Sequence, residues 1–397
     1  MKCVALFICT ILFGFTLSGC VLTDASNKNV DKSRIEEQEK FDISGAVYDL
    51  DGEIEISLNN EEFISISKIS PKDFKFEGSL ESGETYSVLI VKQPESQWCK
   101  VKYGNGLIES EEIKHLRVEC HTFYRGLKGV SEVSTGAYHT CAIVENKVEC
   151  WGDNIYGQTD VPNNLMNPRK ISSGGTHTCV QDDSGVVCWG GEENTDFTKV
   201  EPPENLVNVR ELSSGFFSSC VIDDSGLQCF GNEKFSNLTT PPINLEDPHG
   251  LVVKGSNACV IDGKKPLCWG YNSGAYTLPE TLLEVDIIDI GQTGGCAITN
   301  GLVTCWDRTD KTSSEITGEL ELNTSSNLAV NYSNGCAVTD LGLTCWGRNL
   351  DGVPDLQNIV KFPSQLSFDH HHGCVIESEE LICAGENVYG QITIPNK

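Results

Sequence analysis

Cysteine is the residue whose number and spacing could do the most chemistry in this sequence. The chain has 19 cysteines among 397 residues, and from residue 141 onward they form pairs nine positions apart. A thiol can act as a nucleophile, bind zinc or form a disulfide. Structural zinc sites favour cysteines two to four positions apart, and no two cysteines from Cys99 onward are that close. The spacing therefore favours disulfides.

Sixteen cysteines are expected to form eight disulfides, because an even, regularly spaced set in an exported chain is typical of a disulfide framework. The first pair is Cys99 with Cys120. In the other seven pairs, the first cysteines follow one another at 38, 41, 39, 37, 40 and 38 residues. These pairs are Cys141 with Cys150, Cys179 with Cys188, Cys220 with Cys229, Cys259 with Cys268, Cys296 with Cys305, Cys336 with Cys345, and Cys374 with Cys383. No thiol of the sixteen is left as a nucleophile.

Histidine supplies the candidate metal site. His139, His177 and His372 each precede the first cysteine of their repeat by two residues, in repeats one, two and seven. In a closed ring of seven these repeats are neighbours, and imidazole clusters suit zinc, copper or nickel. The alternative is a hydrogen-bonding position at the start of a strand. It is favoured because the other repeats hold small or polar residues there, namely Ser218, Asn257, Gly294 and Asn334. We therefore expect no metal and no other cofactor.

Catalytic motifs are missing from the sequence. It contains no G-x-S-x-G elbow, no P-loop and no H-E-x-x-H helix. The sequence therefore predicts a binding protein rather than an enzyme. Hydrolase or lyase activity is the least favoured alternative.

The first twenty residues predict export. Lys2 precedes an apolar run from Val4 to Leu17, which is short for a transmembrane helix but suits a signal peptide. The run ends in Leu-Ser-Gly-Cys, which resembles the lipobox of bacterial lipoproteins. The resemblance implies that residues 1–19 are removed and that Cys20 is acylated. With Val21 after the cysteine, it also implies an outer-membrane lipoprotein of the cell envelope, facing either the periplasm or the exterior. An ordinary secretory signal is the alternative.

The charge balance limits the classes of partner that the chain is expected to bind. The chain has 29 basic and 57 acidic residues, a formal charge of −28. Nucleic acids and anionic membrane surfaces both require positive patches. We therefore expect no nucleic-acid partner, and membrane attachment through the lipid alone.

Two segments precede the repeats. Residues 20–40 are polar without apolar periodicity, and predict a flexible tether. Residues 41–121 alternate apolar and polar residues, as in "DISGAVYDLDGEIEISLNN", which predicts strands and hairpins. With its "QP" stretch before Cys99 and its closing Cys120, this segment resembles a small immunoglobulin-like β-sandwich module of bacterial surface lipoproteins. That resemblance implies a spacer.

Residues 122–397 are periodic, and 276 residues in seven repeats give a period near 39. A period of about 40 with several strands per unit indicates a β-propeller. Each stretch that begins and ends with a cysteine pair nine positions apart, which we call a cysteine frame, is predicted to form a hairpin. With Asn300-Gly301 as a two-residue turn, Cys296 and Cys305 face each other on a non-hydrogen-bonded pair, where Cα atoms are about 4.5 Å apart. The Asp-Ser-Gly turns at 183–185 and 224–226 are expected to allow a bulge.

Further sequence features recur among the units. A glycine-rich step precedes the frame ("STGAYHTC", "SSGGTHTC"), and "GDNIYGQTDVP" and "GENVYGQITIP" follow it in the first and last units. An aromatic residue usually follows the second cysteine: Trp151, Trp189, Phe230, Trp269, Trp306 and Trp346. These marks resemble the regulator of chromosome condensation repeat family. The resemblance implies a seven-bladed propeller of four-stranded blades. Because the tryptophans recur at one fixed position of the blades, we expect them to pack between sheets. A carbohydrate-stacking row is the minor alternative.

These observations predict an all-β chain, in which a small immunoglobulin-like β-sandwich precedes a seven-bladed β-propeller. The stretch 123–134 is expected to complete the last blade and close the ring. The propeller is expected to be a platform for a protein or glycan partner. A metal-binding or carbohydrate-binding surface receptor is the alternative.

Overall fold

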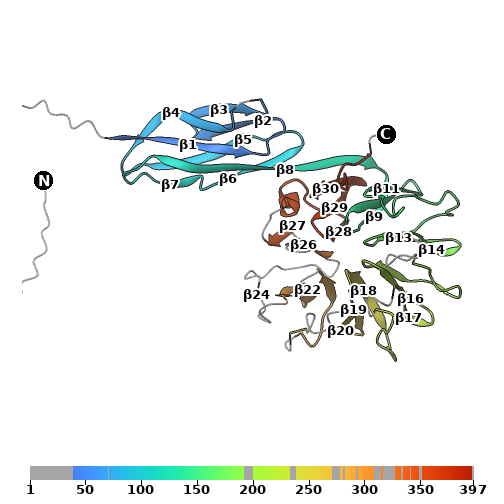
Figure 1. The fold of residues 1–397 in the computed structure, drawn as a ribbon. Helices are drawn as coiled ribbons and strands as arrows, with labels where there is room; N and C mark the ends of the chain where they lie inside the picture. The colour runs from blue at the N-terminus through green and yellow to red at the C-terminus, as the bar shows by residue number, and fades with distance from the viewer. Residues whose placement is uncertain are drawn as a thin grey trace, which may run out of the picture. The chain divides into compact units, whose positions relative to one another are not determined.

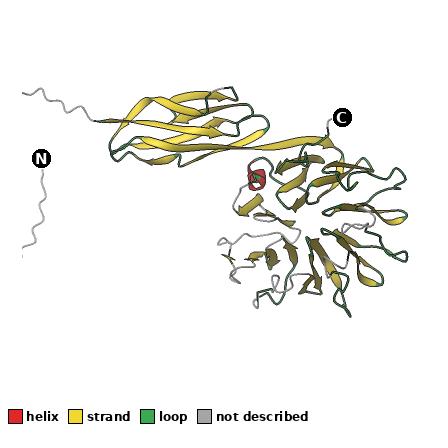
Figure 2. Cartoon of the chain, in the orientation of Figure 1, coloured by secondary structure: helices red, strands yellow, loops and turns green. Residues whose placement is uncertain are grey.

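The all-β prediction is confirmed. The computed structural model describes residues 39–69, 71–191, 200–232, 238–270, 278–279, 282–291, 294–307, 314–315, 327–331, 334–339, 341–347 and 351–395. In these residues strands and loops dominate, and one short 3₁₀ helix, η1 (Val353–Asn358), interrupts them (Figure 2). None of the described helical segments is long and apolar enough to cross a membrane. The expected signal peptide, Cys20 and nearly all of the expected tether lie outside the described residues.

Two sheets form the N-terminal part of the described chain. One sheet has the order β4 (Asp73–Glu81), β1 (Lys40–Tyr48), β8 (Ile113–Lys128) and β6 (Gln97–Lys102). The other has the order β3 (Glu62–Ser67), β2 (Glu53–Leu58), β5 (Thr85–Lys92) and β7 (Asn105–Leu107). Alternate residues of both sheets are buried, as in β1, so that each sheet presents one apolar face.

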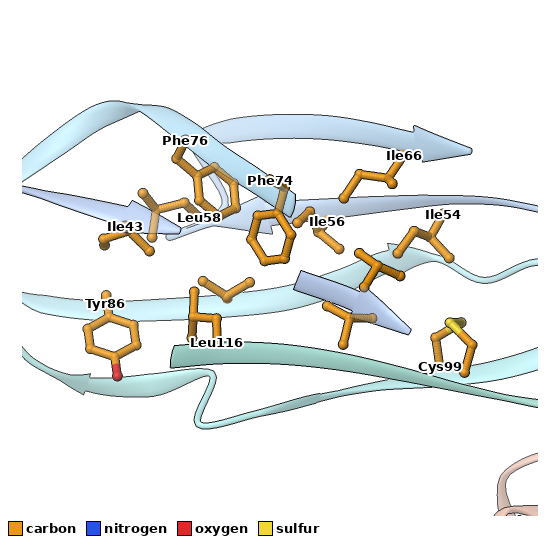
Figure 3. Packing of buried hydrophobic residues seen from close by; sticks show 14 of the residues in the cluster. Ile43, Ile54, Ile56, Leu58, Ile66, Phe74, Phe76, Tyr86, Cys99 and Leu116 are labelled. Atoms are coloured by element: carbon orange, nitrogen blue, oxygen red, sulfur yellow. A yellow bond between two sulfur atoms is a disulfide. The ribbon is translucent and has the colours of Figure 1, made fainter. Parts of the chain in front are cut away.

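These apolar faces share one core. Ile43 from β1, Ile54 and Ile56 from β2, and Phe76 from β4 are fully buried in it (Figure 3). The expected disulfide between Cys99 and Cys120 joins β6 to β8 beside this core, where the two cysteines are directly opposite.

From residue 130 onward the chain repeats one unit of three strands (Figure 1). The first strands are β9 (Val130–Thr135), β12 (Lys170–Ser173), β15 (Glu211–Ser214), β18 (Pro248–Lys254), β21 (Ile287–Ile290), β25 (Leu328–Val330) and β28 (Gln365–Asp369). The second strands are β10 (His139–Val144), β13 (His177–Asp182), β16 (Ser218–Asp223), β19 (Asn257–Asp262), β22 (Gly294–Thr299), β26 (Asn334–Thr339) and β29 (His372–Glu377). The third strands are β11 (Lys147–Gly152), β14 (Gly185–Gly190), β17 (Gly226–Gly231), β20 (Lys265–Gly270), β23 (Leu302–Asp307), β27 (Gly342–Gly347) and β30 (Glu380–Gly385). β24 (Ser314–Glu315) pairs with β23.

Each second and third strand form the hairpin expected from the cysteine frame. The seven predicted cysteine pairs face each other in register and are joined by disulfides, with Cα atoms 4.0–4.1 Å apart. The turn at Asn300-Gly301 has positive φ at both residues, as a two-residue hairpin turn requires.

The expected bulge at the Asp-Ser-Gly turns is wrong. Asp182 pairs directly with Gly185, and no register shift interrupts this hairpin. The Asp182 carboxylate accepts hydrogen bonds from the backbone N–H and the hydroxyl of Ser184, at 2.7 and 2.6 Å, and so closes the turn within two residues.

Strand β8 belongs to two sheets. Its first half pairs with β1 and β6, and residues 123–128 pair antiparallel with β30 of the last repeat (Figure 1). The expectation that this stretch completes the last repeat is thus confirmed for residues 123–128. Residues 130–134 instead belong to β9, the first strand of the first repeat. The expected boundary between residues 121 and 122 lies inside β8.

Candidate functional site

The first strands of the repeats lie side by side and point in the same direction. Ser134, in β9, accepts a hydrogen bond from the backbone N–H of Ser173, in β12, at 2.8 Å. Ser367, in β28, accepts one in the same way from Thr135, in β9, at 2.9 Å. Gln365, two residues before Ser367, bonds to Val133, two residues before Thr135. Because partners advance together along both strands, neighbouring first strands are parallel, and the last repeat contacts the first.

Glycine makes this close approach possible. A Cβ on Gly136 would lie 2.3 Å from the carbonyl oxygen of Gly174 in the next repeat, and a Cβ on Gly174 would lie 2.3 Å from that of Gly215. The glycine-rich step noted in the sequence is therefore required where one repeat meets the next.

A cavity of about 390 Å³ lies between the first strands and is lined by residues of all seven of them. Serines and threonines from β9, β12, β15 and β28 contribute much of the wall. The charged lining residues are Glu132, Asp286, Asp289, Asp369 and Lys254. Four acidic residues and one lysine thus line one cavity.

Burial changes the acidity of these carboxylates. Lys254 donates a hydrogen bond to Asp289 at 2.7 Å and one to the carbonyl oxygen of Val330 at 2.6 Å. Burial still raises the pKa of Asp289, although the Lys254 charge opposes the shift. Burial raises the pKa of Asp369 to about 6 and that of Glu132 to about 7. The cavity therefore stabilises anionic carboxylates poorly.

The three candidate metal ligands are fully buried between repeats. The Nε2 atoms of His139, His177 and His372 lie 2.8, 2.8 and 3.0 Å from the hydroxyl groups of Thr178, Ser219 and Thr140, respectively, each in the following repeat. Burial lowers the pKa of these three imidazoles to about 3, 4 and 3. The described residues contain no group of three metal-binding side chains. The imidazoles are placed as neutral links between neighbouring sheets.

The recurring tryptophans also link neighbouring repeats. The Nε1 atom of Trp189 donates to the carbonyl oxygen of Gln158 at 3.0 Å, and that of Trp151 donates to Gln391 at 3.0 Å. Both glutamines belong to the Tyr-Gly-Gln motifs. Trp151, Trp189, Trp269 and Trp306 are buried, whereas Trp346 is half-buried. The packing interpretation therefore holds for these four tryptophans, and the Tyr-Gly-Gln loop gives the indoles of Trp151 and Trp189 their acceptor.

An aromatic cluster at one end of the first strands was missed by the sequence reasoning. The ring of His370 lies 5.0 Å from that of Tyr138 and 6.2 Å from that of Phe216. Tyr389 lies 5.2 Å from Tyr138. These contacts join repeats one, three and seven. The signal was present, because Tyr138, Phe216 and His370 all stand in the turn between a first and a second strand.

The opposite end of the first strands is formed by the turns that lead into them, which we call the entry turns. Here a leucine that packs inward is followed in the sequence by an apolar residue whose side chain is exposed. Leu165 and Leu206 pack into the core, while the next residues, Met166 and Val207, are 51% and 53% exposed. Leu282 is buried and Leu283 is 75% exposed.

Carboxylates hold the entry turns in place. Asp182 accepts a hydrogen bond from the backbone N–H of Met166 at 2.8 Å, and Asp223 accepts one from Val207 at 2.9 Å. The exposed side chains of Met166 and Val207 are therefore carried on a main chain that these carboxylates hold in place.

The parallel first strands, the disulfide hairpins and the links between repeats define an all-β repeat protein with a β-propeller-type fold. Residues 130–158 match the family model "Regulator of chromosome condensation (RCC1) repeat". The expected resemblance is thus confirmed at the first repeat. No curated protein matches the sequence.

Several solved structures are similar to the chain. The CRINKLY WD40 ectodomain of the Arabidopsis thaliana receptor kinase ACR4 has 18% identity and a TM-score of 0.50, over 66% of this chain and 98% of that one. Prp20p from Saccharomyces cerevisiae, described with its binding to Gsp1p and histones, has 13% identity and a TM-score of 0.48, over 66% and 84%. At these identities the likeness concerns the fold alone.

Proposed function

We propose that the chain is a lipid-anchored protein of the bacterial cell envelope, in which a seven-bladed propeller binds a protein partner. The contacts between the last and first repeats support a closed ring of seven. They include His372 with Thr140, Gln391 with Trp151, and Ser367 with Thr135. The pairing of β8 with β30 adds an outer strand to the seventh blade.

The envelope location rests on the sequence and on the disulfides. All sixteen cysteines of the described residues are paired, which suits an oxidising compartment. Residues 1–19 would act as the lipoprotein signal and Cys20 as the acylated residue. Residues 20–40 would be the tether, 41–121 an immunoglobulin-like spacer and 122–397 the propeller. Metabolic labelling with an alkynyl fatty acid tests the anchor, since Cys20→Ser should abolish labelling. Retention of the label would refute it.

The exposed apolar side chains of the entry turns carry the binding proposal. Met166, Val207 and Leu283 are not needed for the core, because the leucine before each of them already fills that place. Large apolar side chains gathered on one rigid face are typical of a protein–protein interface. We therefore assign the partner site to the entry turns.

Site-directed crosslinking tests this assignment. A photoreactive phenylalanine analogue is placed at Val207 or at Leu283, and for comparison at Leu89, an exposed residue of β5 that is 44% accessible. On intact cells, both entry-turn positions should give the same crosslinked species, and Leu89 should not. Protease treatment of the cells then reports whether the site faces the exterior. The same product from all three positions, or none from the entry turns, would refute the assignment.

A carboxylate on the entry turns gives an independent measurement. Val207→Glu combined with Leu283→Glu should remove the crosslinked species captured from Met166, because both changes place a charge in the apolar contact. Leu89→Glu is the matched control and should leave it unchanged. An undiminished product in the double variant would contradict the proposal.

A further inference from the structure

The cavity between the first strands has features that the partner site does not use. Its wall is formed mainly by the first strands and includes none of the exposed side chains assigned to the partner site. Its charged lining is mainly acidic, with Glu132, Asp286, Asp289 and Asp369 against Lys254. A volume of about 390 Å³ is within the range of small-molecule sites.

Asp369 is the carboxylate that has room for a ligand. The residue is only 8% exposed. One oxygen accepts a hydrogen bond from the backbone N–H of His370 at 2.7 Å, and no described residue donates to the other. In β28, Asp369 shares its face with Gln365 and Ser367, whose side chains reach the neighbouring first strand. The unused oxygen therefore faces the cavity.

Lys254 shows that the cavity accommodates an ammonium group. Its ammonium group is bound by one carboxylate, Asp289, and by one main-chain carbonyl, Val330. This arrangement neutralises Asp289. The Lys254 charge also lowers the pKa of Asp369, but the described residues offer Asp369 no direct ion pair. A buried carboxylate without an ion-pair partner is costly, and an ammonium group from outside would offset that cost.

A second carboxylate lies at the other end of the cavity. Glu132 occupies the place in β9 that Gln365 occupies in β28, since both stand two residues before the serine that faces the first cysteine of the repeat. Asp369 lies four residues beyond Gln365, which corresponds to roughly 13 Å along the strands. Both carboxylates have raised pKa values because they are buried. A ligand that neutralises both must be elongated and carry a cationic group at each end.

Aromatic rings cover the Asp369 end. His370 directly follows Asp369, and its ring contacts Phe216 from the third repeat and Tyr138 from the first. The third and seventh repeats are not neighbours, so the contact between His370 and Phe216 crosses the end of the cavity. Aromatic faces attract ammonium groups, more strongly where water is excluded.

We propose that the cavity binds a linear aliphatic polyamine, with one primary ammonium group at Asp369 beneath the aromatic rings and another at Glu132. The proposed site uses none of the residues assigned to the partner surface, and it does not depend on the lipid anchor.

Calorimetric titration of the purified protein with spermidine at pH 7.5 tests the proposal. We expect saturable one-to-one binding, which Asp369→Asn weakens at least tenfold, because a hydrogen-bonded ion pair in a buried site contributes at least that factor. n-Butylammonium, with one charge, should bind more weakly than spermidine. Glu132→Gln should weaken spermidine binding at least fivefold and leave n-butylammonium binding unchanged.

A chain with a formal charge of −28 also attracts polyamines to its surface. The following controls separate binding at the surface from binding in the cavity. Glu61→Gln, an exposed acidic residue outside the repeats, should not change the affinity. If Asp369→Asn fails to fold, the contrast between the two amines in Glu132→Gln still decides. No saturable binding, or equal weakening by Glu61→Gln and Glu132→Gln, would overturn the proposal.

Discussion

The buried histidines should make the stability of the protein fall in mild acid. Burial holds the pKa of His372 at about 3, against an ordinary value of 6.5, so this imidazole stays neutral in the folded protein. The unfolded chain takes up the proton as the pH falls below 6.5, and stability is lost progressively from there towards pH 3. At pH 5 one such histidine lowers the free energy of unfolding by about 2 kcal/mol, and at pH 7.5 by about 0.1 kcal/mol.

Replacing His372 by asparagine removes this dependence. Repeats four and six already carry Asn257 and Asn334 at this position, so the backbone accepts the residue. The variant loses the hydrogen bond to Thr140, which costs about 1 kcal/mol at every pH. As the pH falls from 7.5 to 5, the variant also avoids the loss of about 2 kcal/mol in the free energy of unfolding that His372 causes in the original chain. The variant should therefore be less stable at pH 7.5 and more stable at pH 5.

Urea unfolding at the two pH values, with the disulfides intact, measures this reversal. Asp369 and Glu132 also titrate in this range, but they are present in both proteins and cancel in the difference. His115→Asn, at an exposed position, is the matched control and should give curves parallel to the original. The reasoning fails if the deficit of His372→Asn is the same at pH 7.5 and pH 5.

Three further changes test the links between and within repeats. Gly174→Ala places a Cβ 2.3 Å from the carbonyl oxygen of Gly215 and should lower the free energy of unfolding by about 2 kcal/mol or more. Replacing Cys259 and Cys268 together by serine should lower it by about 2–3 kcal/mol, measured by non-reducing urea titration. Trp189→Phe keeps an aromatic ring, as the third repeat does naturally, but removes the indole donor and should cost about 1 kcal/mol in the same titration.

Each of these changes has its own counter-result. Gly126→Ala, whose Cβ would have 3.4 Å to its nearest neighbour, is expected to be near neutral, and an equal loss there would refute the packing argument at Gly174. Unchanged unfolding of the double serine variant would mean that the hairpin is held by its strands alone. A neutral Trp189→Phe would assign the role of this tryptophan to its ring alone.

The features of the repeats that depend on local spacing could be predicted. A nine-residue separation with a two-residue turn places Cys296 opposite Cys305, because side chains in a hairpin follow directly from its register. The use of residues 123–128 in the last repeat was also predicted, and their pairing with β30 confirms it. The Asp-Ser-Gly turns were misjudged because the effect of Asp182 on the turn depends on its hydrogen bonds rather than on its residue type.

The candidate sites could not be predicted from local spacing. Asp369 and Glu132 are two of many acidic residues, and only the parallel packing of β9 and β28 shows that they share a cavity. Phe216 and His370 meet because repeats far apart in the sequence approach each other at the end of the first strands. The histidines were recognised, but their partners, such as Thr178, belong to neighbouring repeats.

The double membership of β8 has a mechanical consequence. β1 begins at Lys40 and runs parallel to β8, whose far end pairs with β30. A pull between the start of β1 and the repeats therefore loads the β1–β8 pair lengthwise, so that its hydrogen bonds share the force in shear instead of opening one at a time. Under the proposed lipid anchor and partner site, a load between the two would be spread along the whole β1–β8 pair.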